Sequence, residues 1–314
     1  MLSIVIVTRN TEDLVAGLLS SIEADASLRA VTSEVIVVDN GSTDGTGSMI
    51  ESRFPWVSYV GSAENRGFGA AANMGYRRSS AEFVLFLNSD TRLLEGETIK
   101  MLAFMEHDPS VGIAAPQLVY EDMRPQRSFA LTPCLGLELV PRPVFEALFP
   151  HSRTKGDGSS TPSEVASLIG AALMVKRRLL DLLGGFDERF FFFLEETDLC
   201  LRAEKRGLRV VFFPASKIIH FQGRTVSRSW IRGRIEYAIS LYKFIGKYHS
   251  RPYVRAFVLV RVCKALLFLL PVTLLPFVLC DKSIRRRYRY YARFLMWHAH
   301  GCPDDAGLRV SSQE

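Results

Sequence analysis

Short runs of aliphatic and β-branched residues alternate with segments of helical periodicity in the first part of the chain. The runs predict strands at residues 3–8, 34–39, 57–61, 83–88 and 111–116. The segments between them predict helices at residues 11–23, 46–53, 69–78 and 97–106. Because the runs are almost continuously apolar and helices separate them, the pattern predicts an α/β fold with a mostly parallel sheet that is buried on both faces.

The later part of the chain is organised differently. Periodicity is weak from about residue 124 to residue 164 and returns with an apolar run at 167–176. A helix predicted at 232–248 is amphipathic, since isoleucines recur along it at nearly helical spacing. We therefore expect an α/β domain at residues 1–225 and a helical region at 226–314.

The last fifth of the chain also differs in charge. Residues 251–300 contain ten Lys and Arg and one Asp, a net charge of +9. Because the formal net charge of the whole chain is +6, the remaining residues have a net charge of −3. A nearly neutral body argues against nucleic-acid binding by the main domain. Residues 265–280 carry no charge but are interrupted by Pro271 and Pro276. A spanning helix needs about 20 apolar residues, so this stretch is short and twice broken.

Two structures fit this segment. A broken apolar stretch flanked by Arg and Lys suits anionic lipid headgroups, and we expect a peripheral or monotopic membrane contact at about 251–298. Alternatively, the segment forms an apolar helix pair that is buried in the fold or in a homodimer.

The five cysteines show no CxxC pair, and the apolar first residues lack the basic start of a signal peptide. We therefore expect the protein at the cytoplasmic side of the membrane.

Polar residues follow three of the predicted strands. The first strand ends at Thr8, the second at Asp39 and the fourth at Asn88, with Asp90 two residues later. Ligands in open α/β sheets bind beyond the carboxyl ends of the strands, so Asp39 could accept hydrogen bonds from a nucleobase or a ribose. Asp90 could bind Mg²⁺ or Mn²⁺, because hard cations take carboxylate oxygens and bridge them to phosphates. Alternatively, Ser42 and Asp44 are only turn and capping residues, and Asp90 caps a helix.

A glycine-rich segment offers a competing interpretation. Residues 67–72 fit the pattern GxGxxA, and Asp90 follows eighteen residues later, as in a dinucleotide-binding fingerprint. That fingerprint follows directly on the first strand of its unit, whereas two strand–helix units precede the segment here. An NAD-dependent oxidoreductase is therefore kept only as an alternative.

A second acidic cluster follows four phenylalanines at 190–193 and consists of Glu195, Glu196 and Asp198. Desolvation by apolar neighbours and repulsion between like charges both raise the pKa of a carboxyl group, which suits a general base. The helix dipole would also favour acidic residues in a first helical turn, but it does not explain the aromatic surroundings.

Five segments occur in a fixed order in the first 225 residues: Val38-Asp39-Asn40-Gly41-Ser42-Thr43-Asp44, Asn65-Arg66-Gly67-Phe68-Gly69 with Asn73, Asn88-Ser89-Asp90, Gly184-Gly185-Phe186-Asp187 and Glu195-Glu196-Thr197-Asp198-Leu199. In this order they resemble glycosyltransferase family 2, and within it the rhamnosyltransferase-like branch. The resemblance implies a GT-A fold, a Rossmann-like sheet flanked by helices, followed here by the helical, membrane-associating extension.

The resemblance also implies roles for residues. Thr8 and Asp39 would lie near the nucleobase and Arg66 near the donor phosphates. Asp90 would bind the metal ion, and His220 matches the family's late histidine near the metal and diphosphate, although a lone strand-end histidine is more often a packing residue. The full donor-binding set is Thr8, Arg9, Asn10, Asp39, Asn40, Ser42, Arg66, Gly67, Asn73, Asn88 and Ser89.

The catalytic set implied by the resemblance is Glu196, Glu195 and Asp198. In the family's Glu-Asp-x-Asp motif the second acidic residue is the catalytic base, and it maps onto Glu196. The extra methylene of glutamate moves the carboxylate by about 1.5 Å, one C–C bond length. The sequence therefore leaves open whether Glu196 or Glu195 is the base.

The expected activity is inverting, metal-dependent transfer of a sugar from a nucleotide diphosphate donor to a hydroxyl of a saccharide acceptor. The branch resemblance suggests L-rhamnose from dTDP-rhamnose and a lipid-linked acceptor in cell-surface polysaccharide synthesis. A nucleotidyltransferase would also use such a sheet and a metal, but it would not need the late acidic cluster. A non-catalytic, membrane-bound nucleotide-sugar-binding protein would not need the combination of Asp39, Asp90 and Glu196.

Overall fold

The computed structural model describes residues 1–148, 161–221, 230–274 and 281–309, and the structural statements below concern these residues. Within them, 1–132, 161–191 and 195–221 form one compact unit, and 133–148, 192–194 and 230–309 form a second. The expected boundary between residues 225 and 226 lies outside the described residues.

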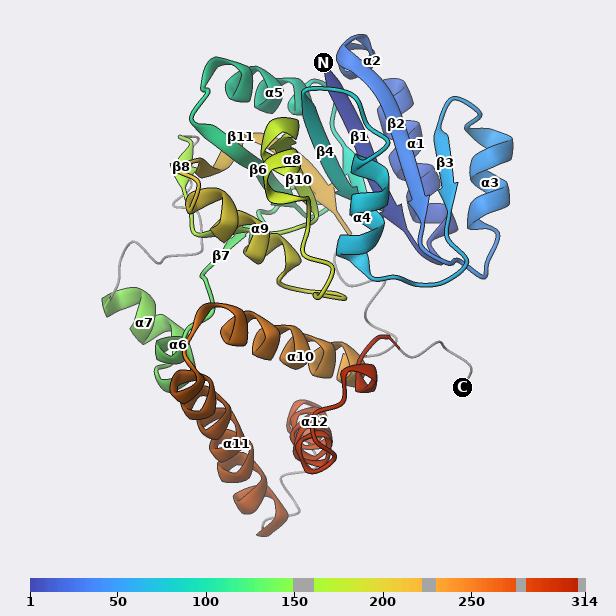
Figure 1. Cartoon of the computed structure of the whole chain (residues 1–314). Helices are drawn as coiled ribbons and strands as arrows, with labels where there is room; N and C mark the ends of the chain where they lie inside the picture. Colours follow the sequence, from blue (N-terminus) through green and yellow to red (C-terminus); the bar gives the residue numbers. More distant parts are fainter. Residues whose placement is uncertain (149–160, 222–229, 275–280, 310–314) are drawn as a thin grey trace. The chain divides into compact units, whose positions relative to one another are not determined.

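The first unit is built on a nine-stranded mixed sheet, in the order β3-β2-β1-β4-β10-β6-β11-β5, with β8 paired to β11 (Figure 1). The first four strands pair in parallel, and so do β6 and β11. β10 runs antiparallel between β4 and β6. The strands are β1 (Leu2–Thr8), β2 (Thr32–Asp39), β3 (Ser58–Gly61), β4 (Phe83–Asn88), β5 (Thr91–Leu93), β6 (Val111–Val119), β8 (Ser163–Glu164), β10 (Ala172–Lys176) and β11 (Arg209–His220).

A small second sheet joins β7 (Phe129–Ala130) to β9 (Ser167–Leu168) in antiparallel pairing. It lies within the first unit. The α/β prediction is confirmed, and the five strands predicted in the first part of the chain occur as β1, β2, β3, β4 and β6, with ends within three residues of those expected.

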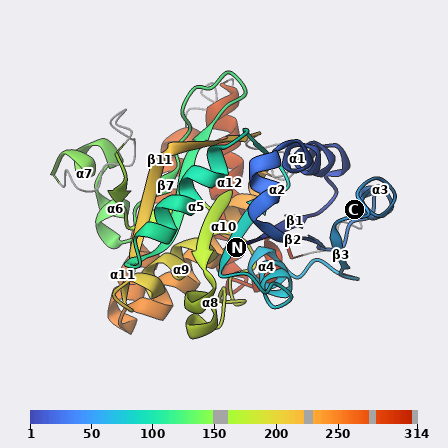
Figure 2. The same ribbon diagram turned by 90° about the horizontal axis from the view of Figure 1, so that it is seen from above.

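Helices cover both faces of the large sheet (Figure 2). On one face, Ile4 and Ile6 of β1 pack into the main hydrophobic core with α1 and α5. α4 and α8 lie on the other face, where Gly75 is required because a Cβ there would come within 2.3 Å of Val5. The helices of this unit are α1 (Glu12–Ala24), α2 (Ala26–Val31), α3 (Thr46–Arg53), α4 (Phe68–Tyr76), α5 (Glu97–His107), α8 (Arg177–Leu183) and α9 (Glu195–Glu204).

The second unit is helical. Its hydrophobic core joins Ile235 and Ile239, which lie one turn apart, to Ala265, Phe294 and Trp297. These side chains come from the three long helices, which explains why an amphipathic pattern was visible in the first of them. The elements are α6 (Leu135–Leu139), α7 (Arg142–Leu148), α10 (Trp230–Tyr248), α11 (Arg251–Leu274), α12 (Lys282–Ala299) and a 3₁₀ turn (Asp304–Ala306).

α11 is a single helix that continues through Pro271. Along it, four leucines are more than half exposed: Leu259, Leu266, Leu267 and Leu270. Among the described helices, none is both long and apolar enough to cross a bilayer. The second expected break, at Pro276, lies outside the described residues.

Candidate active site

The carboxyl ends of β1 and β4 are joined by a chain of hydroxyl groups. Thr8 Oγ1 lies 2.7 Å from Thr11 Oγ1, which donates to Ser89 Oγ at 2.9 Å. All three side chains are buried. Because β1 and β4 are parallel neighbours, their ends share one edge of the sheet, and the hydroxyl chain fixes their relative position there. Asn88 is half-buried, and its backbone N–H donates to Ala171 O at 3.0 Å.

The loops after β1 and β2 hold each other. Asn10 has a left-handed backbone with φ of 52°, its N–H donates to Ser42 Oγ at 2.9 Å, and its Oδ1 accepts from the Thr43 N–H at 2.7 Å. Asn10 and Ser42, two of the predicted donor-binding residues, therefore fix the shape of these loops. Arg9 differs from them: its Nε is buried and has no hydrogen-bond partner among the described residues. Such a donor is costly to bury unless a ligand or water accepts from it.

Asp39, at the end of β2, is buried and accepts two hydrogen bonds. The Ser42 N–H donates to Oδ1 at 2.9 Å, and the hydroxyl of Tyr59 donates to Oδ2 at 3.0 Å. Burial and this bond to Asp39 raise the pKa of Tyr59 to about 12. Tyr59 was not predicted, because an aromatic residue in a strand carries no signal of a hydrogen-bond partner on the neighbouring strand.

The glycine-rich segment is held by Asn40. Its Nδ2 donates to Asn65 Oδ1 at 2.9 Å and to Gly67 O at 3.1 Å, and its Oδ1 accepts from the Arg66 N–H at 2.8 Å. Gly67 has φ of 85°, and a Cβ on it would lie 2.3 Å from Phe191 O. The glycine is therefore needed for the contact with Phe191. The side chain of Arg66 stays exposed.

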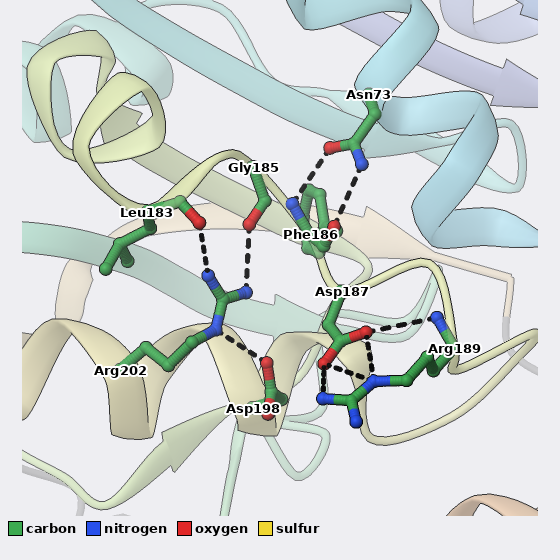
Figure 3. Close-up of polar contacts among 8 residues, drawn as sticks. All are labelled: Asn73, Leu183, Gly185, Phe186, Asp187, Arg189, Asp198 and Arg202. Carbon is green, nitrogen blue, oxygen red and sulfur yellow. Dashed lines mark hydrogen bonds and ion pairs between the residues drawn. The ribbon is translucent and has the colours of Figure 1, made fainter.

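Asn73, a predicted donor-binding residue, has its side-chain amide engaged within the protein. It is fully buried on α4, where its Nδ2 donates to Phe186 O at 2.9 Å and its Oδ1 accepts from the Phe186 N–H at 2.8 Å (Figure 3). Its Nδ2 also donates to Glu188 Oε1 at 2.9 Å. With both ends of the amide engaged, this side chain positions the loop after Gly185.

Asp90 and His220 lie together although 130 positions separate them in the chain. β11 pairs antiparallel with β5, which places His220 opposite Thr91, and the Phe221 N–H donates to Asp90 O at 2.8 Å. His220 Nε2 lies 3.5 Å from Asp90 Oδ1, and both side chains are about nine-tenths buried. The two expected metal ligands therefore face each other.

Gln126, which the sequence did not identify, fixes the histidine ring. Its Nε2 donates to the carbonyl oxygens of Val119 and His220, so its Oε1 faces His220 Nδ1 at 3.1 Å. An amide oxygen only accepts, so Nδ1 carries the hydrogen in this assignment and a neutral ring presents the lone pair of Nε2 to Asp90. Two lone pairs repel at this distance unless a cation or a proton lies between them. The two possible metal-ligating atoms, a carboxylate oxygen and the nitrogen of an oriented imidazole, therefore fit a divalent cation.

The three carboxylates of the late cluster have different environments. Asp198 is completely buried and accepts from Arg202 Nε at 2.7 Å, while the other two nitrogens of Arg202 donate to Leu183 O at 3.1 Å and Gly185 O at 2.9 Å (Figure 3). Asp198 therefore holds the arginine that secures the loop through Gly184 and Gly185. These contacts favour a role in holding the loop, and the catalytic role expected for Asp198 stays a prediction.

Glu195 and Glu196 point to different neighbours. Glu195 is buried against α4, where a Cβ at Gly69 would lie 3.7 Å from its own Cβ. Glu196 is half-buried, and a Cβ at Gly170 would lie 3.5 Å from its Cγ. The next residue, Ala171, accepts the hydrogen bond from Asn88 at the end of β4. Glu196 is thus the carboxylate beside the strand-end edge.

The backbone is strained just before this cluster. Phe193 and Leu194 have φ of 70° and 67°, values that favour glycine, and non-glycine residues in this region cost about 1–3 kcal/mol each. α10 holds the segment: Ser240 Oγ donates to Phe192 O at 2.8 Å, and the ring of Tyr237 packs edge-on against Phe193 at 5.7 Å between centroids. Such strain clusters at functional sites.

Comparison with known proteins identifies the family. The model of "Glycosyl transferase family 2" matches residues 3–184, more than half of the chain. The N-acetylglucosaminyl-diphospho-decaprenol L-rhamnosyltransferase of Mycobacterium tuberculosis is 29% identical over 232 residues, which cover 69% of this chain and 75% of that protein. The dTDP-rhamnosyl transferase RfbF of Shigella flexneri is 26% identical over 192 residues, 60% of each chain.

The fold is also found in solved structures. The mannosyltransferase PcManGT of Pyrobaculum calidifontis, in complex with GDP-Man and Mn²⁺, matches with a TM-score of 0.57 at 18% identity, over 96% of this chain and 86% of that one. This similarity confirms the predicted GT-A type fold with C-terminal helices. The chain therefore belongs to glycosyltransferase family 2 and is an enzyme that transfers a sugar from a nucleotide sugar.

Proposed function

We propose that the protein is an inverting, metal-dependent glycosyltransferase in which Asp90 and His220 hold Mn²⁺ or Mg²⁺. The observation that carries the proposal is the orientation of His220, whose Nε2 lies 3.5 Å from Asp90 Oδ1 while Gln126 accepts from Nδ1. A bound divalent cation would supply neutralisation of the negative charge on the diphosphate leaving group. The Mn²⁺ in the Pyrobaculum mannosyltransferase structure supports this choice of metal.

The donor would lie along the edge formed by β1, β2 and β4. Thr8 and Asp39 would bind the nucleoside, and the cations Arg9 and Arg66 would bind the diphosphate. Four further members of the expected set, Asn10, Asn40, Ser42 and Asn73, would act by holding the loops. We propose dTDP-L-rhamnose as the donor, supported by the names of the Mycobacterium and Shigella relatives.

Glu196 would be the general base. Its carboxylate takes the proton of the acceptor hydroxyl as that oxygen forms a bond to the anomeric carbon. The bond from the anomeric carbon to the diphosphate oxygen breaks with its electron pair, and the nucleoside diphosphate departs from the opposite face. A single displacement of this kind inverts the anomeric configuration. Glu195, buried against α4, would remain a neighbour of the base without contacting the acceptor.

The acceptor would be a saccharide linked to a lipid, as the printed name of the Mycobacterium relative indicates for that protein. We propose residues 1–225 as the catalytic domain and 226–314 as a region that contacts the cytoplasmic membrane surface. Two features of the helical unit support this contact. α11 exposes a row of leucines, and α12 exposes five arginines: Arg285, Arg286, Arg287, Arg289 and Arg293.

A thermal-shift panel tests the donor site. UDP, dTDP, GDP and NAD are each added with and without Mn²⁺ to the wild type and to Asp90→Asn, since a ligand that binds the folded state raises its melting temperature. We expect a Mn²⁺-dependent shift with dTDP that Asp90→Asn loses. A shift with NAD alone, or a dTDP shift that Asp90→Asn retains in full, would contradict the proposal.

A further inference from the structure

A pocket of about 200 Å³ lies within the helical unit, where α6, α10, α11 and α12 meet. Its lining combines three cations with aromatic side chains. The cations are Arg234, Arg261 and Lys264, and a single carboxylate, Glu138, opposes them. The aromatic part of the wall is formed by Tyr237, Tyr290, Tyr291 and Phe294. The lining therefore carries two positive charges in excess.

The carboxylate of Glu138 is shared between two cations. Its Oε1 accepts from Arg261 Nη1 and its Oε2 from Lys264 Nζ, both at 2.9 Å. Glu138 and Arg261 are largely buried, with 19% and 12% of their side chains exposed. A largely buried Arg261 and an exposed Lys264 that share one counter-charge leave an unbalanced positive charge at the pocket.

Arg261 also has an unused donor. Its Nη2 reaches the hydroxyl of Tyr290 at 3.4 Å, but its Nε is buried without a hydrogen-bond partner in the described parts of the chain. The third cation, Arg234, lies over the ring of Tyr290 at 5.4 Å and forms no ion pair that would neutralise it within those parts. Buried donors without a partner are rare in folded proteins, so the Nε of Arg261, beside two further cations at the same pocket, points to an anionic ligand.

The size and charge of the pocket restrict the ligand. Pockets for drug-sized molecules measure about 300–1,000 Å³, so this one is small for such a ligand but has room for a small anion. A phosphate monoester carries about −1.5 to −2 charges at pH 7, which balances the excess of two. Arginine and tyrosine side chains donate well to phosphate oxygens.

We propose that this pocket binds a phosphate or diphosphate group. The group could be part of a lipid headgroup at the membrane or a soluble phosphate compound. The first source rests on the proposed function, because a lipid-linked acceptor would carry such a group. The pocket itself does not depend on that function, since none of its residues belongs to the proposed donor or metal site.

Calorimetric titration with inorganic diphosphate tests the pocket. EDTA is included because the proposed donor site would hold diphosphate through a metal ion. The variants Lys264→Gln and Arg234→Gln each remove one charge from the lining, and Arg255→Gln, on an exposed position of α11 outside the pocket, is the matched control. We expect each lining variant to weaken binding about tenfold, as for one charge-assisted hydrogen bond, and the control to bind as the wild type does.

Glu138→Gln should act in the opposite direction and strengthen binding, since it removes the competing carboxylate. Equal affinity in wild type, Lys264→Gln, Arg234→Gln and Arg255→Gln would overturn the proposal. Asp90→Asn should leave binding in EDTA unchanged, so a failed donor site and a failed phosphate pocket are distinguishable. Because Lys264 and Arg234 are exposed, their variants remain informative even if Glu138→Gln does not fold.

Vesicles distinguish the two sources. Flotation is compared on phosphatidylcholine vesicles that contain phosphatidic acid, a phosphomonoester, or phosphatidylglycerol, a phosphodiester, at equal surface charge. A preference for phosphatidic acid that Lys264→Gln loses and Arg255→Gln keeps assigns the pocket to a lipid headgroup. Diphosphate binding without that preference supports a soluble phosphate compound and overturns the lipid source.

Discussion

Two acid–base pairs of the first unit differ in how many of their polar atoms have a hydrogen-bond partner. Asp198 and Arg202 meet at 2.7 Å, and every nitrogen of the guanidinium group has an acceptor. Asp90 and His220 lie 3.5 Å apart, and only one nitrogen of the ring is engaged, by Gln126. A pair whose polar atoms all have hydrogen-bond partners stabilises the fold, whereas a pair with a free lone pair can still bind a ligand. We therefore expect Asp198 to stabilise the fold and Asp90 to bind a ligand.

The strongest test of this difference is Asp90→Asn. We expect kcat to fall about 10⁴-fold, because a cation that stabilises the leaving group contributes several kcal/mol to the transition state. The melting temperature should change by less than about 2 °C, since a 1 kcal/mol effect moves it only a few degrees in a domain of this size. A sugar-transfer assay and a thermal melt on the same sample give both values. Turnover within tenfold of wild type would remove Asp90 from the metal site.

Glu196→Gln should have the next largest effect. Loss of a general base lowers kcat by about 10²–10⁴-fold, whereas binding of the nucleotide should not change. Glu195→Gln is the matched control, since it removes the adjacent carboxylate that is buried against α4. Steady-state kinetics and nucleotide titration of both variants decide between them. If Glu195→Gln lost more activity than Glu196→Gln, the assignment of the base would be reversed.

Asp198→Asn should affect stability instead of chemistry. Removing one partner of a buried ion pair costs about 3–5 kcal/mol, because the other charge stays buried without compensation. Both side chains are well buried, with 0% and 17% exposed. Urea unfolding measures the change, and the folded fraction should bind the nucleotide as before. A loss of less than about 1 kcal/mol, or a loss of activity without a loss of stability, would contradict a structural role.

The smallest effect is expected at the hydrogen bond between Tyr59 and Asp39. Asp39 is intermediate between Asp198 and Asp90, because it accepts hydrogen bonds from Tyr59 and from the Ser42 N–H but forms no ion pair among the described residues. The pKa of Tyr59 is raised from 10.0 to about 12 in the folded protein. The contribution of the protonated Tyr59 to the free energy of unfolding is therefore complete below pH 10 and is lost as the pH rises through about 12. Urea unfolding between pH 9 and 12 should show a steeper fall for wild type than for Tyr59→Phe. Parallel curves would indicate that Tyr59 titrates normally.

Sequence patterns predicted the elements that bring the site together. A strand that is buried on both faces must be apolar along its length, so β1, β2 and β4 and the polar residues at their ends were visible as pattern breaks. The direction of a strand is not visible in the same way, because an apolar run looks the same in either direction. This is why the antiparallel course of β10 between β4 and β6 was not predicted.

Partners distant in sequence were the other limit. Gln126 and Arg202 orient a histidine and a loop, yet each is an ordinary polar residue until the fold supplies its acceptors. Asn73 illustrates the reverse case. It belongs to a segment that resembles the family's donor site, but it contacts the loop after Gly185. Sequence resemblance locates such residues near a site without giving the atoms that they contact.

The left-handed pair Phe193 and Leu194 has a consequence for protein engineering. Exchanging the C-terminal helices with those of a relative is a direct way to seek a new acceptor preference. A chimera joined at residue 225 would keep this pair but replace Ser240 and Tyr237, which hold the segment. The start of α9, with both candidate bases, would then follow an unsupported turn. A junction after Tyr248, where α10 ends, would transfer the new helices and keep that support.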